Sequence, residues 1–286
     1  MNNPSLLVIG HGTRRPRGVE EFLELVDRIR LRAAGQVSRI EGGLIELARP
    51  TVSDGVARLL DEASASVGGP RPPRRIIAVP LLLGTAGHLR SDIPALLAVE
   101  QDRHPGLTFG LASALGPHPI LRELLRERID TALEGAGRPG TSVVLVGRGT
   151  TDPQANADVA AVTRLLWEGS GLDCVELSFV AVTAPSLPQS LERLRRVGAR
   201  RIVVLPYLLF EGLLSEQIAA ETAQFAAENP ELDLRVAGLL GESDQLADLV
   251  LHRYRQARAL TDPSALTAPP LPLQTEPASW GTPGLL

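Results

Sequence analysis

Three side chains that can hold protons or metal ions follow short apolar runs in the first third of the chain. His11 lies between two glycines after one run, Glu46 lies at the end of the next, and His88 follows a glycine-containing turn after a third. Neutral imidazoles bind divalent iron, cobalt, nickel and zinc. Two protein ligands leave coordination positions open, which suits an ion that is handed on. The residue types therefore indicate a transfer site for a divalent metal.

Each of these side chains also has an ordinary structural interpretation. A histidine after a strand is often a hydrogen-bonded turn residue, and Glu46 alone can be a salt-bridge partner or a charge at a helix N-terminus. His104 and His118 each precede a proline, and His252 lies within an amphipathic stretch, so these three are assigned structural roles. Only the grouping of two imidazoles and a carboxylate favours chemistry.

The elements that must position these groups alternate along the chain. Short β-rich runs and stretches of helical period succeed one another, which predicts βα units around parallel sheets. For the first half we expect strands at Ser5–Gly10, Gly43–Leu47, Arg75–Pro80 and Leu107–Ala112, and helices at Arg17–Ala34, Thr51–Ser66, from about Arg90, and at His118–Leu133. Open α/β sheets bind ligands outside the carboxyl ends of their strands, so the three polar groups are expected to converge at one sheet edge.

The same order of motifs then repeats roughly 125–137 residues later, which indicates a duplicated domain. Five segments match: Leu6–Ile9 with Ser142–Val146, Gly10–Pro16 with Gly147–Pro153, Arg49–Val52 with Ala184–Leu187, Arg74–Pro80 with Arg200–Pro206, and Ala114–Pro117 with Leu239–Glu242. The alignment places Arg148 at the position of His11, Ala181 at that of Glu46 and Leu213 at that of His88. We therefore expect a metal-binding domain at 4–134 and a second domain without the ligands at 141–260, joined by the Gly/Pro-rich connector 135–140.

The composition limits the remaining possibilities. Of the 286 residues, 44 % are apolar and 22 % charged, as in an ordinary folded protein, and the formal net charge of −4 gives no general attraction to nucleic acid. The single cysteine, Cys174, excludes an intramolecular disulfide and a multi-thiolate metal site. The first residues lack the basic segment of a signal peptide, and no apolar run has the length of a membrane span, so we expect a cytoplasmic protein with no membrane partner. Residues 261–286 are proline-rich without periodicity and are expected to be disordered.

Three stretches together resemble the signature segments of the sirohydrochlorin chelatases of the CbiX/SirB type. They are Leu6–Thr13 (LLVIGHGT), Gly43–Pro50 (GLIELARP) and Pro80–Pro94 (PLLLGTAGHLRSDIP). The family has an HGS or HGT turn, an F-x-E-x-x-x-P segment and a P-x-x-L-x-x-G-x-H-x-x-x-D-I-P segment in this order. The departures are Thr13 for the commoner Ser, Leu44 for a frequent aromatic residue, and Ala86 for Gly.

The resemblance implies two ferrochelatase-like α/β domains, each a four-stranded parallel sheet of strand order 2-1-3-4 flanked by helices. It implies a lyase that inserts Co²⁺ or Fe²⁺ into the tetrapyrrole sirohydrochlorin, in cobalamin or siroheme biosynthesis, with no organic cofactor and the domain pair formed within one monomer. His11 and His88 would bind the metal, and Glu46 would assist proton removal. Independently of the resemblance, charge and position make four arginines candidates to bind substrate carboxylates: Arg14, Arg15, Arg90 and, from the second half, Arg148. For the three in the first half, a solvated surface position is the ordinary alternative.

Two other functions remain open at this point. A histidine phosphatase also begins with a strand and a His-Gly pair, but its nucleophilic histidine typically follows an arginine, whereas Gly10 precedes His11 here. A carrier that binds metal or tetrapyrrole without turnover has the same ligand requirements. Hydrolysis of an aryl phosphate identifies the first alternative, and the absence of multiple turnover identifies the second.

Overall fold

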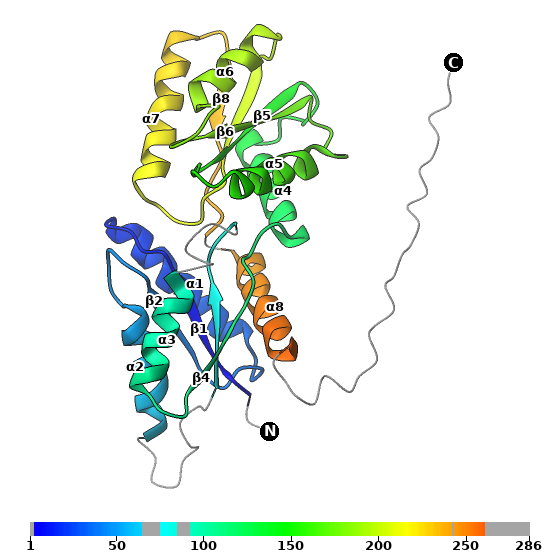
Figure 1. Cartoon of the computed structure of the whole chain (residues 1–286). Helices are drawn as coiled ribbons and strands as arrows, with labels where there is room; N and C mark the ends of the chain where they lie inside the picture. The colour runs from blue at the N-terminus through cyan, green and yellow to red at the C-terminus, as the bar shows by residue number, and fades with distance from the viewer. Residues whose placement is uncertain (1–2, 65–74, 85–91, 242, 261–286) are drawn as a thin grey trace.

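The computed structural model describes residues 3–64, 75–84, 92–241 and 243–260. Strands and helices alternate along the whole described chain (Figure 1). The first half contains β1 (Ser5–Gly10), α1 (Pro16–Arg32), β2 (Ile40–Leu44), α2 (Val52–Ser64), β3 (Arg75–Pro80), α3 (Ile93–Arg103), β4 (Thr108–Leu111) and α4 (Pro119–Leu133). The second half contains β5 (Thr141–Gly147), α5 (Pro153–Trp167), β6 (Cys174–Phe179), α6 (Leu187–Arg196), β7 (Arg201–Pro206), α7 (Leu213–Glu228), β8 (Asp233–Val236) and α8 (Asp244–Leu260). The tail predicted to be disordered, 261–286, lies outside the described residues.

The strands form two four-stranded parallel sheets with the orders β2-β1-β3-β4 and β6-β5-β7-β8. This confirms the predicted fold class and strand order. In the first sheet, Gly10 at the end of β1 pairs with Leu44 of β2, and Ile9 pairs with Pro80 of β3. The carboxyl ends of these strands therefore meet at one edge, which is where ligands bind in such sheets.

The second strand ends earlier than its sequence predicts. The expected strand was Gly43–Leu47, but β2 covers Ile40–Leu44 because the chain turns directly after Leu44. Leu47 adopts a φ of 69°, a left-handed conformation that does not continue a strand. Glu46 therefore lies in a turn beyond the sheet edge.

The last helix of each half packs on the sheet of the other half (Figure 1). Helix α8 packs on α1, β3 and β4, while α4 packs on β7, β8 and α5. The wholly buried Tyr254 of α8 donates its hydroxyl to the carbonyl of Pro4 at 2.7 Å, beside the start of β1. Ion pairs of 2.6 Å between Arg32 and Asp248 and of 2.8 Å between Arg28 and Asp244 join α1 to α8.

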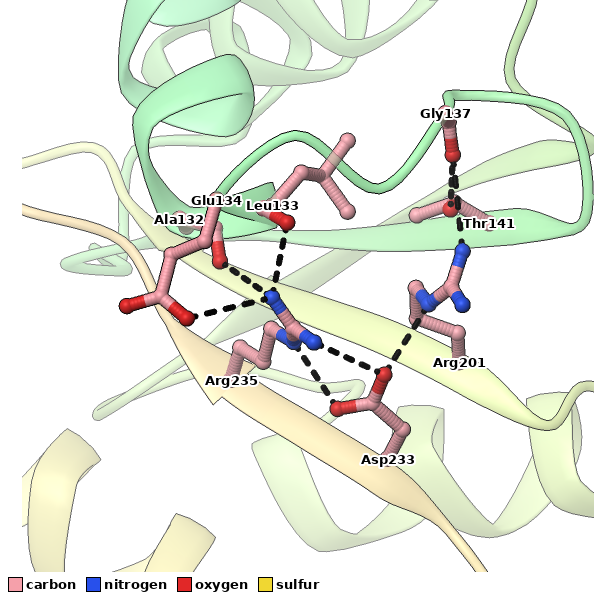
Figure 2. Close-up of polar contacts among 8 residues, drawn as sticks. All are labelled: Ala132, Leu133, Glu134, Gly137, Thr141, Arg201, Asp233 and Arg235. Atoms are coloured by element: carbon pink, nitrogen blue, oxygen red, sulfur yellow. Dashed lines mark hydrogen bonds and ion pairs between the residues drawn. The ribbon is translucent and has the colours of Figure 1, made fainter.

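Figure 2 shows how the C-terminus of α4 is held on the second sheet. Arg235 of β8 donates to the carbonyls of Ala132 and Leu133 at 3.0 and 2.8 Å, which the helix itself leaves without partners. Asp233 receives hydrogen bonds from both Arg235 and Arg201, at 2.8 and 2.9 Å, and so orients the two guanidinium groups. The end of α4 is thereby fixed to the edge of the second sheet.

The expected boundaries at 134 and 141 consequently separate the two sheets but not the helices that cover them. Each half thus exchanges its last helix, α4 or α8, with the other half. This exchange of helices also merges the hydrophobic cores: one continuous cluster contains side chains from β1 and β3 as well as from β5 and β7, such as Val8 and Leu145. Smaller clusters under α2 and α3 and under α6 and α7 fill the other faces of the sheets. Among the described residues no helix has both the length and the apolarity needed to cross a membrane.

Because α8 packs on the first sheet, a mutation in α8 should destabilise the first half of the molecule. Tyr254→Ala removes a fully buried ring and should cost about 3–5 kcal/mol of unfolding free energy, whereas Tyr254→Phe loses one hydrogen bond and should cost about 1 kcal/mol. Amide hydrogen exchange in the alanine variant should accelerate most in β1, β3 and β4. Leu191→Ala, at a buried position of α6, is the control and should act on β5 and β6. Acceleration by Tyr254→Ala confined to β5–β8 would contradict the exchanged packing.

Candidate functional site

The turn that carries His11 has a glycine on either side, and Gly12 leaves no room for a side chain. A Cβ at Gly10 would lie 2.8 Å from Leu44 Cδ2 and 2.9 Å from the ring of Phe22. Gly12 has a φ of 104°, and a Cβ there would lie 1.9 Å from the carbonyl oxygen of Glu46. The chain can therefore turn sharply after β1 and pass directly over the following turn.

The turns after β1 and β2 are joined by backbone hydrogen bonds. The N–H of Ile45 donates to the carbonyl of Gly10 at 2.9 Å, and the N–H of Glu46 donates to that of His11 at 3.1 Å. These bonds bring His11 Nε2 to 3.3 Å from Glu46 Oε1. The imidazole is 29 % exposed and the carboxylate 53 %, so the pair is accessible from solvent.

The spacing of this pair suits two ligands of a single ion. Metal–nitrogen and metal–oxygen bonds of about 2.0–2.2 Å place neighbouring ligands about 3.0–3.4 Å apart, and the observed separation is 3.3 Å. No third histidine, cysteine or carboxylate completes a cluster among the described residues. The predicted third group, His88, lies outside them. The loop that contains His88 leaves the same edge of the sheet, because the N–H of Leu81 donates to the carbonyl of Ile9 at 2.7 Å.

The four predicted arginines have different surroundings. Arg14 and Arg148 are exposed, and the guanidinium group of neither forms a hydrogen bond or ion pair with a described residue, so both groups are open to an anion. Arg15 instead pairs with Glu216 of α7 at 2.6 Å, which leaves it less suited to a substrate carboxylate. Arg90 lies outside the described residues.

The second half repeats the backbone of the site without its chemistry. The N–H groups of Val180 and Ala181 donate to the carbonyls of Gly147 and Arg148 at 2.9 and 3.0 Å. Gly149 has a φ of 83°, and a Cβ there would lie 2.0 Å from the carbonyl oxygen of Ala181, which matches the arrangement at Gly12. The backbone geometry thus agrees with the alignment of Arg148 with His11 and of Ala181 with Glu46, so the turn in the second half carries a guanidinium and a methyl group at these positions.

Sequence reasoning missed the contact between this site and the second half. Glu21 of α1 accepts a hydrogen bond from the N–H of Glu211, in the turn before α7, at 2.7 Å. A signal was available, because Glu21 lies among Gly18, Phe22 and Leu25 on the buried stripe of α1. A charged residue on such a stripe requires a specific partner.

Comparison with known proteins agrees with this architecture. A sequence profile of the CbiX family matches residues 5–132 and 142–257. A sirohydrochlorin cobaltochelatase of Priestia megaterium is 30 % identical over 254 residues, which cover 88 % of this chain and 79 % of that protein. A sirohydrochlorin ferrochelatase of the same species is 28 % identical over 251 residues, which cover 88 % of this chain and 89 % of that protein.

Solved structures similar to this chain also include sirohydrochlorin chelatases. The structure of SirB from Bacillus subtilis with Fe³⁺ matches with a TM-score of 0.76 at 25 % identity and covers 90 % of this chain and 96 % of that one. The sirohydrochlorin chelatase SirB of Bacillus subtilis subspecies spizizenii in complex with cobalt matches with a TM-score of 0.70, also at 25 % identity, over 90 % of this chain and 95 % of that one. The two profile matches begin at β1 and at β5 and each covers one repeat. The chain belongs to the CbiX family.

Proposed function

We propose that this chain inserts divalent cobalt or iron into sirohydrochlorin. The observation that carries the proposal is the His11 Nε2–Glu46 Oε1 pair, 3.3 Å apart at the carboxyl edge of the first sheet. The names of the relatives, a cobaltochelatase and a ferrochelatase for sirohydrochlorin, support the substrate. Both metals remain candidates, because imidazole and carboxylate ligands do not separate cobalt from iron.

The reaction exchanges one ion for two protons. The divalent metal forms bonds to the four ring nitrogens, and the two pyrrole N–H protons leave. His11 and His88 hold the ion through neutral imidazole nitrogens and leave positions open for the ring nitrogens. Glu46, adjacent to His11, is a further ligand of the bound ion. As the ion departs, Glu46 accepts one of the two protons and the freed imidazole of His11 accepts the other. Binding energy from the substrate's carboxylates can offset the cost of bending the ring toward the metal.

The two halves take different roles in this proposal. The first half holds the metal, while the second half supplies a wall and a cationic group for substrate carboxylates. Arg148 stays protonated near neutral pH and repels a cation, so it fits the second role. Leu213, aligned with His88, is 63 % exposed at the first position of α7 and offers no metal ligand. We further propose that the protein is a lyase that works as a cytoplasmic monomer without an organic cofactor.

The activity itself is the first test. Purified protein should accelerate the spectral change of sirohydrochlorin with Co²⁺ or Fe²⁺ under anaerobic conditions, with multiple turnovers. His11→Ala and His88→Ala should each lower kcat by about 10²-fold or more, because each removes a metal ligand or base. His104→Ala removes an imidazole at the C-terminal end of α3 and serves as the matched control. No rate above that of the free ion would contradict the proposal, and conversion of only one equivalent would indicate a carrier.

The turn geometry predicts a second outcome. Gly12→Ala places a methyl group against the carbonyl of Glu46, so the turn must open and Co²⁺ affinity, measured by titration without tetrapyrrole, should fall strongly. Gly106→Ala is the control, because its φ of 90° carries the same backbone strain with nothing within 4 Å of the added Cβ. That variant should lose only about 1 kcal/mol of stability and bind Co²⁺ normally. Equal Co²⁺ affinity in both variants would exclude the turn from the metal site.

The role of Arg148 gives a third outcome. Arg148→Ala should raise KM for sirohydrochlorin and leave kcat within about threefold, the pattern expected when uniform binding is lost. The exposed Arg196, which pairs with Glu192 on α6, provides the control substitution to alanine. Loss of metal affinity in Arg148→Ala, or turnover that requires Arg148→His and Leu213→His together, would show that the metal site is wrongly assigned to the first half.

A further inference from the structure

We propose that Glu21 is a positioning residue that fixes the turn before α7 against the turn carrying His11. This inference depends on the proposed function, because it assigns the contact a role in bringing metal and tetrapyrrole together. The turn in question, called the α7 turn below, comprises Phe210, Glu211 and Gly212.

The backbone of Glu211 contacts α1 through both its N–H and its carbonyl group. Its N–H donates to Glu21 Oε2 at 2.7 Å, a short hydrogen bond to a charged acceptor. Its carbonyl oxygen lies over Gly18, one turn earlier on α1, where a Cβ would lie only 2.2 Å from it. Residues three apart lie on the same face of a helix, so Gly18 and Glu21 form one docking surface.

The burial of Glu21 makes this hydrogen bond costly to lose. Glu21 is 9 % exposed and faces Arg17 Nε at 3.6 Å. Removing the N–H of Glu211 takes a short hydrogen bond away from this buried carboxylate. The α7 turn is therefore held firmly in one place.

The same docking surface adjoins both ends of the turn that carries His11. Thr13, two residues after His11, lies 2.8 Å through Cγ2 from a Cβ built on Gly18 and 3.5 Å through Oγ1 from one built on Gly212. Phe22, next to Glu21, packs its ring under Gly10 and meets Phe210 edge-to-face with centroids 6.2 Å apart. A displacement of the α7 turn therefore acts on the residues on either side of His11.

The second half repeats this surface only in part. Helix α5 begins at Pro153 after an equivalent turn, because the N–H of Asp152 donates to Thr150 Oγ1 as that of Arg15 does to Thr13 Oγ1. Counting from these turns, Asp158 takes the place of Glu21 and Ala155 that of Gly18. The methyl group of Ala155 excludes a carbonyl at the distance found over Gly18. Both halves therefore have a carboxylate on this helix face, whereas the close approach of a backbone carbonyl depends on Gly18 in the half that carries His11.

Substitutions at Glu21 separate a hydrogen bond from a charge. Glu21→Gln keeps an oxygen that accepts the N–H of Glu211, whereas Glu21→Asp keeps the charge but is one methylene too short to reach it. We expect Glu21→Gln to retain kcat within about threefold. Glu21→Asp and Glu21→Ala should lower kcat about tenfold or more, because small displacements of groups at an active site slow the reaction strongly. Asp244→Ala is the control, because it removes the ion pairs to Arg28 and Arg32 on the same helix away from the α7 turn.

Two readouts distinguish positioning from general stability. Kinetics with sirohydrochlorin and Co²⁺ are measured below the unfolding range of each variant, and amide hydrogen exchange is measured for the segment 207–213. The proposal predicts faster amide hydrogen exchange and a lower kcat in Glu21→Asp. In Glu21→Gln the exchange rate and kcat should both stay near the wild-type values. In Asp244→Ala kcat should be unchanged although Tm is lower. Unchanged kcat in Glu21→Asp, or an equal fall in Asp244→Ala, overturns it. If the wild type shows no turnover, the proposed function fails, while the exchange data still show whether Glu21 holds the α7 turn.

Discussion

The close passage of Gly12 over the carbonyl of Glu46 is the constraint on which the site depends. Because no side chain fits between them, the turns after β1 and β2 lie in direct backbone contact and are joined by two hydrogen bonds. The imidazole of His11 and the carboxylate of Glu46, which lie on those turns, are thereby brought to 3.3 Å, a spacing that suits two ligands of one metal ion. The chemistry of the site thus follows from which residues occupy two turn positions.

The second half shows that this backbone arrangement does not itself require metal chemistry. It keeps the glycine, the hydrogen bonds and the reversed φ, with Val182 at 66° corresponding to Leu47 at 69°, yet places Arg148 and Ala181 where the first half has His11 and Glu46. In the proposed function, duplication therefore provides one turn for a cation and one for an anion on similar backbone frames. The exchange of α4 and α8 merges the cores of the two halves, so that their relative position is fixed by buried packing as well as by surface contacts.

Much of this arrangement can be read from the sequence. Strand-sized apolar runs, the glycines around His11 and the five matched segments predict both sheets, the turns after β1 and β5, and the positions of Arg148 and Ala181, because each depends on residues near one another in the chain. The exchange of α4 and α8 cannot be predicted in this way, since periodicity shows that a helix has an apolar face but not which sheet it covers. The hydrogen-bond partner of Glu21 cannot be predicted for the same reason. Glu211 is distant in sequence, and only the fold shows that its N–H meets the carboxylate.

A structure of the full chain with Co²⁺ bound, with the ion located by anomalous scattering, tests the central claim most directly. The account predicts one cobalt ion at about 2.0–2.2 Å from His11 Nε2 and from a carboxylate oxygen of Glu46, with His88 as a further ligand and no ligand from the turn at Arg148. Cobalt bound elsewhere, or at the turn of the second half, would contradict the assignment of metal chemistry to the first.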